Sequence, residues 1–205
     1  MSVAGSYRQG VDDQPKLPAV APRARLCSEN AHKLSELQAS LPAWELTLLG
    51  SSDYPAEDGD SYEENARGKV QHGRAVGSRY EWMIGEDSGL ECEALDGAPG
   101  LYSARWAAKG RLASALLEQL AGESNRRARM ITVLVASAPS GEEIVVSGVL
   151  EGIIANEERG QGGFGYDPVF IPLGQQQTMA ELGGDWKSRN SHRARAAAAL
   201  AARCG

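Results

Sequence analysis

The sequence lacks most features of secreted or membrane-bound proteins. It has three cysteines without a C-x-x-C spacing, and an odd number favours reduced thiols over a disulfide framework. No apolar run approaches the ~18 residues of a membrane span, and the chain does not open with a signal-like apolar segment. These absences predict a cytoplasmic protein with no membrane partner.

Positive charge is also scarce. The chain carries 21 Lys and Arg against 27 Asp and Glu, a net charge of −6. It therefore has no diffuse positive field to hold a nucleic acid backbone. We expect no nucleic acid partner, although this balance is compatible with a local basic pocket for a small polyphosphate.

The length sets the number of domains. With 205 residues, 42% of them hydrophobic, the chain can bury one substantial core and is short for two. Residues 1–22 contain several glycines, prolines and aspartates, a composition typical of a flexible tail. We therefore expect a single folded domain over residues 23–205.

Beyond residue 22, helical and extended patterns alternate. Leucines at spacings of three and four predict a helix that ends before Pro42, and Ser61 and Glu64 form a capping box that begins another. Residues 138–141 separate two β-rich runs as a hairpin turn does. These patterns predict an α/β fold with a mixed β-sheet flanked by helices. We expect strands at 23–27, 44–49, 82–85, 130–137 and 143–149, an extended run at 166–172, and helices from 28 to 41, 61 to 77, 111 to 121, and 188 or 191 to 203.

The first candidate segment is Ser28-Glu29-Asn30-Ala31-His32-Lys33, at the expected turn from strand to helix. Alone, it could be an ordinary helix cap followed by a surface lysine. A helix N-terminus, however, presents N–H groups and a partial positive charge to a phosphate, and Lys33 adds a full charge. The segment therefore predicts a phosphate site.

Two adjacent acids, Glu86 and Asp87, follow the short apolar strand 82–85. Catalytic groups in α/β proteins favour such a strand end. The pair could also be a polar strand end before a turn at Gly89. Adjacent carboxylates repel unless a cation or a shared proton relieves them, so a divalent metal is the natural occupant.

Residues 160–165 match the G-x-G-x-x-G fingerprint of dinucleotide-binding proteins, and Asp185 lies where a ribose-binding acid is expected. We reject this interpretation because the fingerprint requires a helix directly after the loop. Residues 166–172 instead contain two prolines in an extended run. A loop that approaches a ligand closely, with Phe164 stacked on a base, fits better. A tight turn with a core phenylalanine is the structural alternative.

His192 and Arg193 are expected in the first turn of the alanine-rich C-terminal helix. Positive charge there opposes the helix dipole, and a bound anion would resolve the conflict. A basic first turn without a ligand is the ordinary explanation. Lys69 and Lys187 could likewise be surface lysines.

Together, in this order, the segments resemble the Ham1/inosine triphosphatase family of purine nucleoside triphosphate pyrophosphatases. The likeness runs from about Leu26 to Leu200, nearly everything beyond the tail. It rests on seven family motifs. T-x-N-x-x-K is similar to residues 28–33, E-x-G…E-N-A-x-x-K to 57–59 and 64–69, D/E-D-S-G-L to 86–90, G-x-P-G-x-Y-S-A-R to 97–105, G-G-F-G-Y-D-P to 162–168, T-x-A-E to 178–181, and K-x-x-x-S-H-R to 187–193.

The resemblance implies an elongated fold with two lobes around a central active-site cleft, and a homodimer. It also implies hydrolysis of ITP, dITP and XTP to the monophosphate and pyrophosphate, with Mg²⁺ or Mn²⁺ as the cofactor. This reaction would remove non-canonical nucleotides from the nucleotide pool. Asp87 would be the general base and a metal ligand, and Glu57 the second metal ligand. The implied substrate contacts are Ser28, Glu29, Asn30, Ala31, His32, Lys33, Lys69, Ser88, Phe164, Gly165, Tyr166, Asp167, Lys187, His192 and Arg193.

Several alternatives stay open. A nucleotide-binding relative without catalysis would keep these loops. Turnover would be lost through the negative charge of Glu29 in the phosphate segment and through the first strand, 23–27, which is charged and short in apolar length. An interaction protein would carry the acids as surface decoration. A Maf-like nucleotide pyrophosphatase shares the fold, but its S-x-S-P-R-R start is absent. The sequence does not distinguish hypoxanthine from xanthine as the preferred base.

Overall fold

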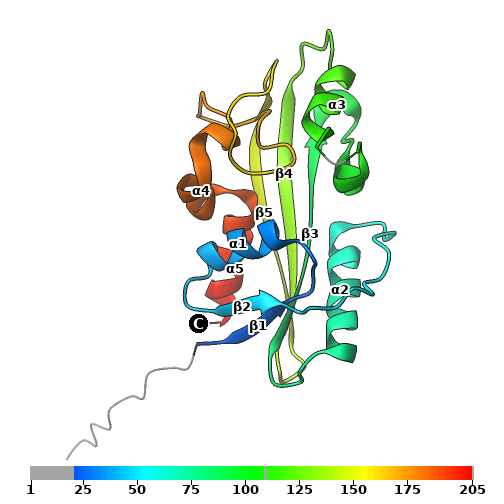
Figure 1. The fold of residues 1–205 in the computed structure, drawn as a ribbon, viewed down its shortest axis with the longest axis vertical. Helices are drawn as coiled ribbons and strands as arrows, with labels where there is room; N and C mark the ends of the chain where they lie inside the picture. Colours follow the sequence, from blue (N-terminus) through cyan, green and yellow to red (C-terminus); the bar gives the residue numbers. More distant parts are fainter. Residues whose placement is uncertain (1–20, 109, 205) are drawn as a thin grey trace, which may run out of the picture.

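The computed structural model describes residues 21–108 and 110–204, which form an elongated molecule around one sheet (Figure 1). The expected tail, 1–22, lies outside the described residues apart from its last two positions. The strands are β1 (Arg23–Leu26), β2 (Glu45–Leu48), β3 (Trp82–Cys92), β4 (Arg127–Ser137), β5 (Glu143–Ile154) and β6 (Phe170–Pro172). The helices are α1 (Ala31–Ser40), α2 (Tyr62–Val76), α3 (Leu112–Gln119), α4 (Met179–Asn190) and α5 (His192–Cys204), with 3-10 turns η1 (Glu93–Leu95) and η2 (Gly100–Arg105).

The strand order is β2-β1-β3-β4-β5-β6. β1 pairs in parallel with both β2 and β3, whereas β3 to β6 pair antiparallel. The predicted α/β fold with a mixed sheet is therefore confirmed. No described helix is long and apolar enough to cross a membrane.

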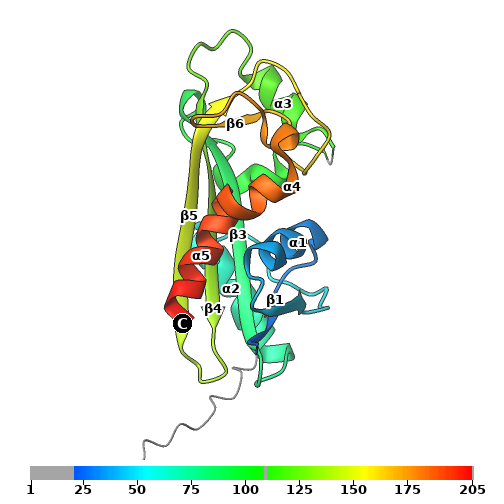
Figure 2. The same ribbon diagram turned by 90° about the vertical axis from the view of Figure 1, so that its left-hand side faces the viewer.

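Helices cover both faces of the sheet. Figures 1 and 2 show α2 on one face and α5 on the other, with α1 and α4 beside α5. Two glycines allow the close approach. A Cβ on Gly85 would lie 2.0 Å from the Ala66 carbonyl oxygen in α2, and a Cβ on Gly148 would lie 2.1 Å from the His192 carbonyl oxygen in α5. The sheet positions both helices directly against its backbone.

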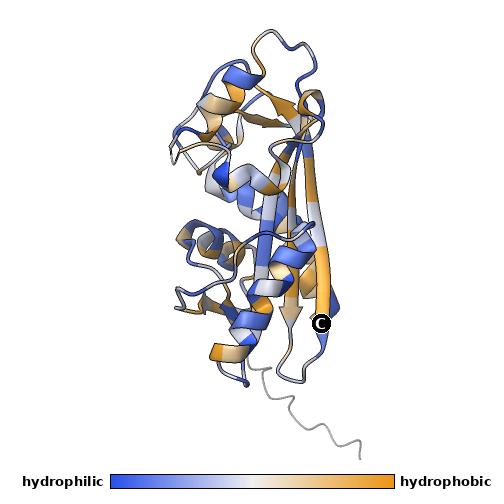
Figure 3. Cartoon of the chain, turned by 90° about the vertical axis from the view of Figure 1, so that its right-hand side faces the viewer, coloured by the Kyte–Doolittle hydropathy of each residue, from blue (hydrophilic) through white to orange (hydrophobic). Residues whose placement is uncertain are grey.

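The hydrophobic residues, concentrated on the strands in Figure 3, form three clusters. One joins β1, β2, α1 and α5 around Leu134 and Leu200, and a second joins α3, α4 and β6 around Leu116 and Phe170. The third lies between α2 and the sheet and includes Met83. The first two clusters are the cores of the two lobes.

The prediction for β3 was wrong in length. We expected a strand over 82–85, but β3 continues to Cys92 because it pairs with β4 along its whole length. Glu86 and Asp87 therefore lie in the middle of a strand. Gly89 pairs with Ile131 of β4 and therefore forms no turn. A Cβ at this position would lie 2.5 Å from the Gly100 carbonyl oxygen.

Two other expectations need correction. The extended run predicted over 166–172 is a strand only at β6, and residues before it form turns.

Helix α4 was not predicted, because Gly183 and Gly184 argue against a helix. The chain bends at Gly183, whose φ of 77° divides α4 into two helical pieces. The helix α5 begins after Ser191, one of the two predicted starts.

The remaining predicted elements are present, although β4 begins at Arg127 and β5 continues to Ile154, beyond the expected 130–137 and 143–149. Ser61 caps α2 by accepting a hydrogen bond from the Glu64 amide. The turn between β4 and β5 closes with hydrogen bonds at Ala138 and Gly141. As inferred from the two prolines, no helix follows the glycine-rich loop directly, because the next one begins at Met179.

Candidate active site

The candidate site forms where β3 loses its parallel neighbour. β1 pairs with β3 only as far as Ile84. Among the described residues, the β3 edge from Gly85 to Gly89 has no strand partner, and a single bridge joins Glu91 to Pro99. The two acids of the sequence motif therefore lie beside an open edge.

Glu86 and Asp87 point to opposite faces of the sheet, as adjacent strand residues do. Glu86 contacts Lys33 of α1 and Arg193 of α5, whereas Asp87 contacts Asn65 and Lys69 of α2. The expectation that these adjacent acids share a metal was therefore wrong.

Asp87 is held by α2. Asn65 donates a hydrogen bond to Asp87 Oδ2 at 3.0 Å, and Lys69 Nζ lies 3.5 Å from Asp87 Oδ1. Burial raises the pKa of the Asp87 carboxyl, although Lys69 and Asn65 act in the opposite direction. A carboxylate with a raised pKa, 5% exposed beside an open strand edge, is suited to accept a proton.

Lys69 links Asp87 to Glu57. Its Nζ lies 2.5 Å from Glu57 Oε1 and donates a hydrogen bond to the Glu86 carbonyl oxygen at 2.9 Å. Burial alone would raise the pKa of Glu57, but Lys69 lowers it below its usual range. Arg105 donates a further hydrogen bond to the Glu57 carbonyl oxygen. The two acids predicted to bind metal therefore converge on one cation.

This donor set fits a hard divalent cation. Mg²⁺ prefers oxygen ligands and is commonly held by one or two carboxylates together with substrate phosphates and water. Glu57 and Asp87 supply two carboxylates, and Glu57 is partly exposed. No cluster of three or more His, Cys, Asp or Glu side chains suited to a metal exists within the described part of the chain. These two carboxylates are the residues here whose chemistry suits such a cation.

On the opposite face, Glu86 is completely buried between two cations. Lys33 Nζ lies 2.5 Å from Glu86 Oε2, and Arg193 Nη2 lies 2.9 Å from Glu86 Oε1. Burial alone would raise the pKa of Glu86, but Lys33 and Arg193 outweigh it and hold the pKa far below its usual range. Glu86 is therefore ionised and sets the position of both cations.

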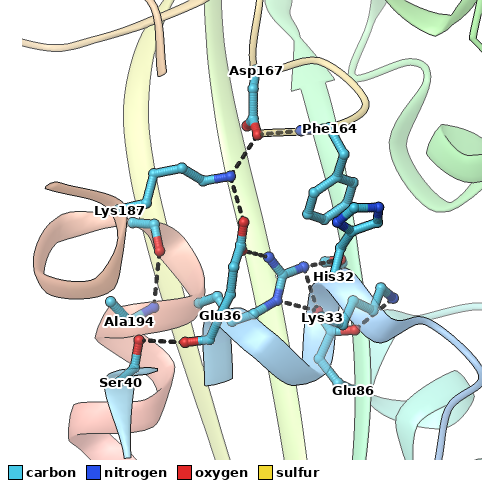
Figure 4. A network of polar contacts seen from close by, with 12 residues as sticks. His32, Lys33, Glu36, Ser40, Glu86, Phe164, Asp167, Lys187 and Ala194 are labelled. Atoms are coloured by element: carbon cyan, nitrogen blue, oxygen red, sulfur yellow. Dashed lines mark hydrogen bonds and ion pairs between the residues drawn. The ribbon is translucent and has the colours of Figure 1, made fainter. Parts of the chain in front are cut away.

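Glu36 extends this network and was missed by sequence reasoning. Its carboxylate pairs with both Arg193 and Lys187, and Lys187 also pairs with Asp167 (Figure 4). The signal was its place three residues after Lys33, on the same face of a helix. Asn65 was missed likewise, although it lies one helical turn before Lys69. Glu36 joins α1, α4 and α5 through one carboxylate.

The N-terminus of α1 differs from expectation. Asn30 is the N-cap, and its Oδ1 accepts hydrogen bonds from the His32 and Lys33 amides. Ser28 Oγ accepts a hydrogen bond from the Asn30 amide. The cap therefore occupies N–H groups that we expected to bind phosphate, and the Lys33 ammonium is the stronger candidate donor here.

A cavity of about 880 Å³ lies between the two lobes. It opens on the face of the sheet that carries Ser88 and is bordered by α1, α4, α5 and the glycine-rich loop. Ser28, Glu57, Lys69 and Asp87 are predicted site residues that do not line it. Those that do are Glu29, Asn30, Ala31, His32, Lys33, Ser88, Phe164, Gly165, Tyr166, Asp167, Lys187, His192 and Arg193.

Phe164 provides an aromatic surface in this cavity. Its ring stacks on His32 with centroids 5.2 Å apart, and Lys187 Nζ lies 5.2 Å from its centroid. Asp167 fixes the loop by accepting a hydrogen bond from the Phe164 amide at 2.8 Å. Tyr166 instead belongs to the core of one lobe, and its hydroxyl donates to the Ser103 carbonyl oxygen.

Arg193 has little hydrogen-bonding capacity left. Four hydrogen bonds join it to Glu86, Glu36 and Ser88. A guanidinium has five N–H donors. The conflict between Arg193 and the helix dipole is therefore relieved by carboxylates of the protein.

An aromatic cavity, clustered cations and a carboxylate pair at an open strand edge define a nucleotide-handling α/β protein. Comparisons with known proteins agree. The model of the Ham1 family matches residues 24–203. The dITP/XTP pyrophosphatase of Deinococcus deserti is 43% identical over 178 residues, 84% of this chain and 85% of that protein. This chain belongs to the Ham1 family.

Solved structures support the same assignment. A HAM1 protein from Coxiella burnetii is 34% identical, with a TM-score of 0.76 over 89% of this chain and 98% of that chain. The Staphylococcus aureus Ham1 protein gives a TM-score of 0.75 at 34% identity, over 89% of this chain and 97% of that chain.

Proposed function

We propose that this protein hydrolyses the non-standard purine nucleoside triphosphates ITP, dITP and XTP to the monophosphate and pyrophosphate. The observation that carries the proposal is the open edge of β3, which separates an aromatic cavity from a carboxylate with a raised pKa. The names of the relatives, dITP/XTP pyrophosphatases, support the substrate class.

The two sides of the edge suggest how the substrate lies. The purine enters the cavity and stacks near Phe164. The triphosphate crosses the β3 edge, passes Lys33 and reaches Lys69 and Asp87 on the α2 side. Lys33 is the proposed link, because it lines the cavity and its ammonium pairs with Glu86, the residue next to Asp87 on β3.

Asp87 is the proposed general base. Water attacks the α-phosphorus and gives its proton to the Asp87 carboxylate, while the bond from the α-phosphorus to the bridging oxygen breaks. Pyrophosphate leaves with the electron pair of that bond. Asn65 orients the carboxylate, and Lys33 and Lys69 stabilise the negative charge on the phosphates.

The charge of the site favours a divalent cation. Five cations, Lys33, Lys69, Arg105, Lys187 and Arg193, are paired with five carboxylates, Glu36, Glu57, Glu86, Asp87 and Asp167, so these cations leave no net positive charge for the substrate. The site therefore does not offset a highly negative triphosphate by itself. Glu57 and Asp87 would hold Mg²⁺ or Mn²⁺, which would supply positive charge at the phosphates when bound.

Base selectivity follows from hydrogen-bond donors in the cavity. A 6-oxo purine presents an acceptor where adenine presents an amino donor. A buried donor such as His192 or a backbone amide would therefore bind hypoxanthine or xanthine and leave adenine unpaired.

A panel of ITP, dITP, XTP, GTP and ATP, each with and without Mg²⁺, tests the proposal. Pyrophosphate release should be largest for the first three and require the metal. A nucleotide-binding relative without catalysis would show a thermal shift with ITP but no release. We further propose that the protein is a cytoplasmic homodimer. Light scattering of the purified protein gives the molar mass and so tests the subunit number.

A further inference from the structure

Beneath α5, the sheet carries a buried hydroxyl with no assigned role. Thr132 of β4 is fully buried, and its Oγ1 has no hydrogen-bond partner among the described residues. Its neighbours on β3 and β5 are Ser88 and Gly148, which share its face of the sheet. Ser88 accepts a hydrogen bond from Arg193, and Gly148 lies against the His192 carbonyl. Thr132 therefore lies under the first turn of α5.

His192, in that same turn, has a second unpaired atom. Its Nδ1 is buried without a partner within 21–108 and 110–204, while the residue lines the cavity. Buried polar atoms in proteins are nearly always hydrogen-bonded, so an unpaired atom in the first turn of α5 and another on the strand beneath that turn call for an explanation. The nitrogen that can meet a ligand in the cavity is then Nε2.

The protonation of His192 determines what it can recognise. Burial, together with the charge of Arg193, lowers the pKa of His192 well below its usual value. A neutral imidazole has one N–H donor and one acceptor nitrogen, and the partner of one nitrogen decides the role of the other. Whether Nε2 donates or accepts therefore depends on what Nδ1 contacts.

We propose that the Thr132 hydroxyl donates a hydrogen bond to His192 Nδ1 and thereby keeps the ring proton on Nε2, facing the cavity. A change of the Thr132 χ1 rotamer redirects Oγ1 without moving the backbone. The Nε2–H group then binds the acceptor of a 6-oxo purine and opposes the amino group of adenine. Thr132 is a positioning residue for base selectivity, and this consequence rests on the proposed function.

The test compares Thr132→Val, which removes the hydroxyl at similar volume, with Thr132→Ser, which retains it. The ring nitrogens of the three histidines are observed by ¹⁵N NMR without nucleotide. His192 is assigned by elimination with His32→Gln and His72→Gln. The ratio of kcat/KM for ITP to that for ATP is measured on the same proteins.

We expect wild type and Thr132→Ser to show the Nε2–H tautomer. Thr132→Val should show a mixture of tautomers and an ITP-to-ATP ratio about two- to tenfold lower, the effect of one neutral hydrogen bond. An Nδ1–H tautomer in wild type, an unchanged tautomer in Thr132→Val, or identical behaviour of the serine and valine variants would each overturn the proposal. If Thr132→Val does not fold by circular dichroism, Thr132→Ala takes its place.

The two arms separate this inference from the proposed function. Absence of pyrophosphate release from ITP by wild type would refute the proposed function, whereas the NMR arm would still decide the role of Thr132. A tautomer change without a change in the ITP-to-ATP ratio would refute the role in selectivity.

Discussion

Replacing Asp87 with asparagine should abolish turnover without loss of the fold. The two side chains have nearly the same shape, and the carbonyl oxygen of the introduced amide can still accept the hydrogen bond from Asn65. Lys69 keeps its pairing with Glu57. Burial raises the pKa of Asp87, so its ionised form is less favourable in the folded protein than in the unfolded chain at neutral pH. A neutral amide at this position therefore should not lower the melting temperature.

The expected loss of kcat is at least ~10²–10⁴-fold, the usual contribution of a positioned general base. Steady-state release of pyrophosphate from ITP with Mg²⁺ measures it. Glu91→Gln is the matched control, because Glu91 lies on the same face of β3 but pairs with Arg129. We expect the control to retain wild-type kcat. Retention of a tenth or more of wild-type kcat by the Asp87→Asn variant would refute the assignment.

The pH profile separates a general base from a merely structural acid. A base acts when deprotonated, so activity should fall as pH drops through the Asp87 pKa, above the ~3.9 of an ordinary aspartate. Lys69 lowers the pKa of Asp87, so Lys69→Met should raise it and move the acid limb of the residual activity to higher pH. An acid limb that stays in place would contradict the role of Asp87.

Four further outcomes are expected. EDTA should abolish pyrophosphate release, and added Mg²⁺ should restore it. Glu57→Gln should raise the Mg²⁺ concentration for half-maximal activity. Full activity in EDTA would refute the requirement for a divalent metal. Lys33→Ala should lower kcat/KM for ITP, XTP, GTP and ATP alike, by about ten- to a hundredfold, and a changed ranking would place Lys33 at the base. Because the folded pKa of Glu86 is depressed, its stabilisation is present above the unfolded pKa of ~4.3 and is lost as pH falls below that value. The urea midpoint of wild type should therefore fall over this pH range, and that of Lys33→Met should fall less. A constant midpoint in wild type, or the same fall in both proteins, would argue against the pairing of Lys33 with Glu86. Gly148→Ala should reduce the free energy of unfolding by about 1–3 kcal/mol, whereas Gly184→Ala, with no atom within 4 Å of the added carbon, should not; equal effects in denaturant titrations would contradict the close packing of α5.

Local signals predicted part of this structure well. The capping residue of α2 and the hairpin between β4 and β5 depend on neighbouring residues, and both were located from sequence. The length of β3 depends on pairing with β4, far away in the chain, so the apolar run 82–85 showed only part of the strand. Helix α4 was hidden by Gly183 and Gly184, because the chain leaves helical geometry at Gly183 and the two helical pieces are short.

The candidate site shows the same division. The resemblance to the family motifs located many of the residues around the cavity, but it did not show that Glu86 and Asp87 lie on opposite faces of the sheet. That separation follows from strand alternation once both acids are inside β3. Glu36 has no signal beyond its helical spacing, because its two cations come from segments some 150 residues further along the chain.

The shortness of β1 has a consequence for how this protein can change. A longer β1 would hydrogen-bond to β3 beyond Ile84 and would add main-chain pairing to the sheet. The same pairing would cover the backbone beside Glu86 and Asp87, where the triphosphate is proposed to cross. Selection for stability alone should therefore favour variants in which β1 is longer, whereas selection for turnover should favour variants in which β1 stays short. The four-residue length of β1 is thus a compromise between sheet stability and access to the unpaired edge of β3.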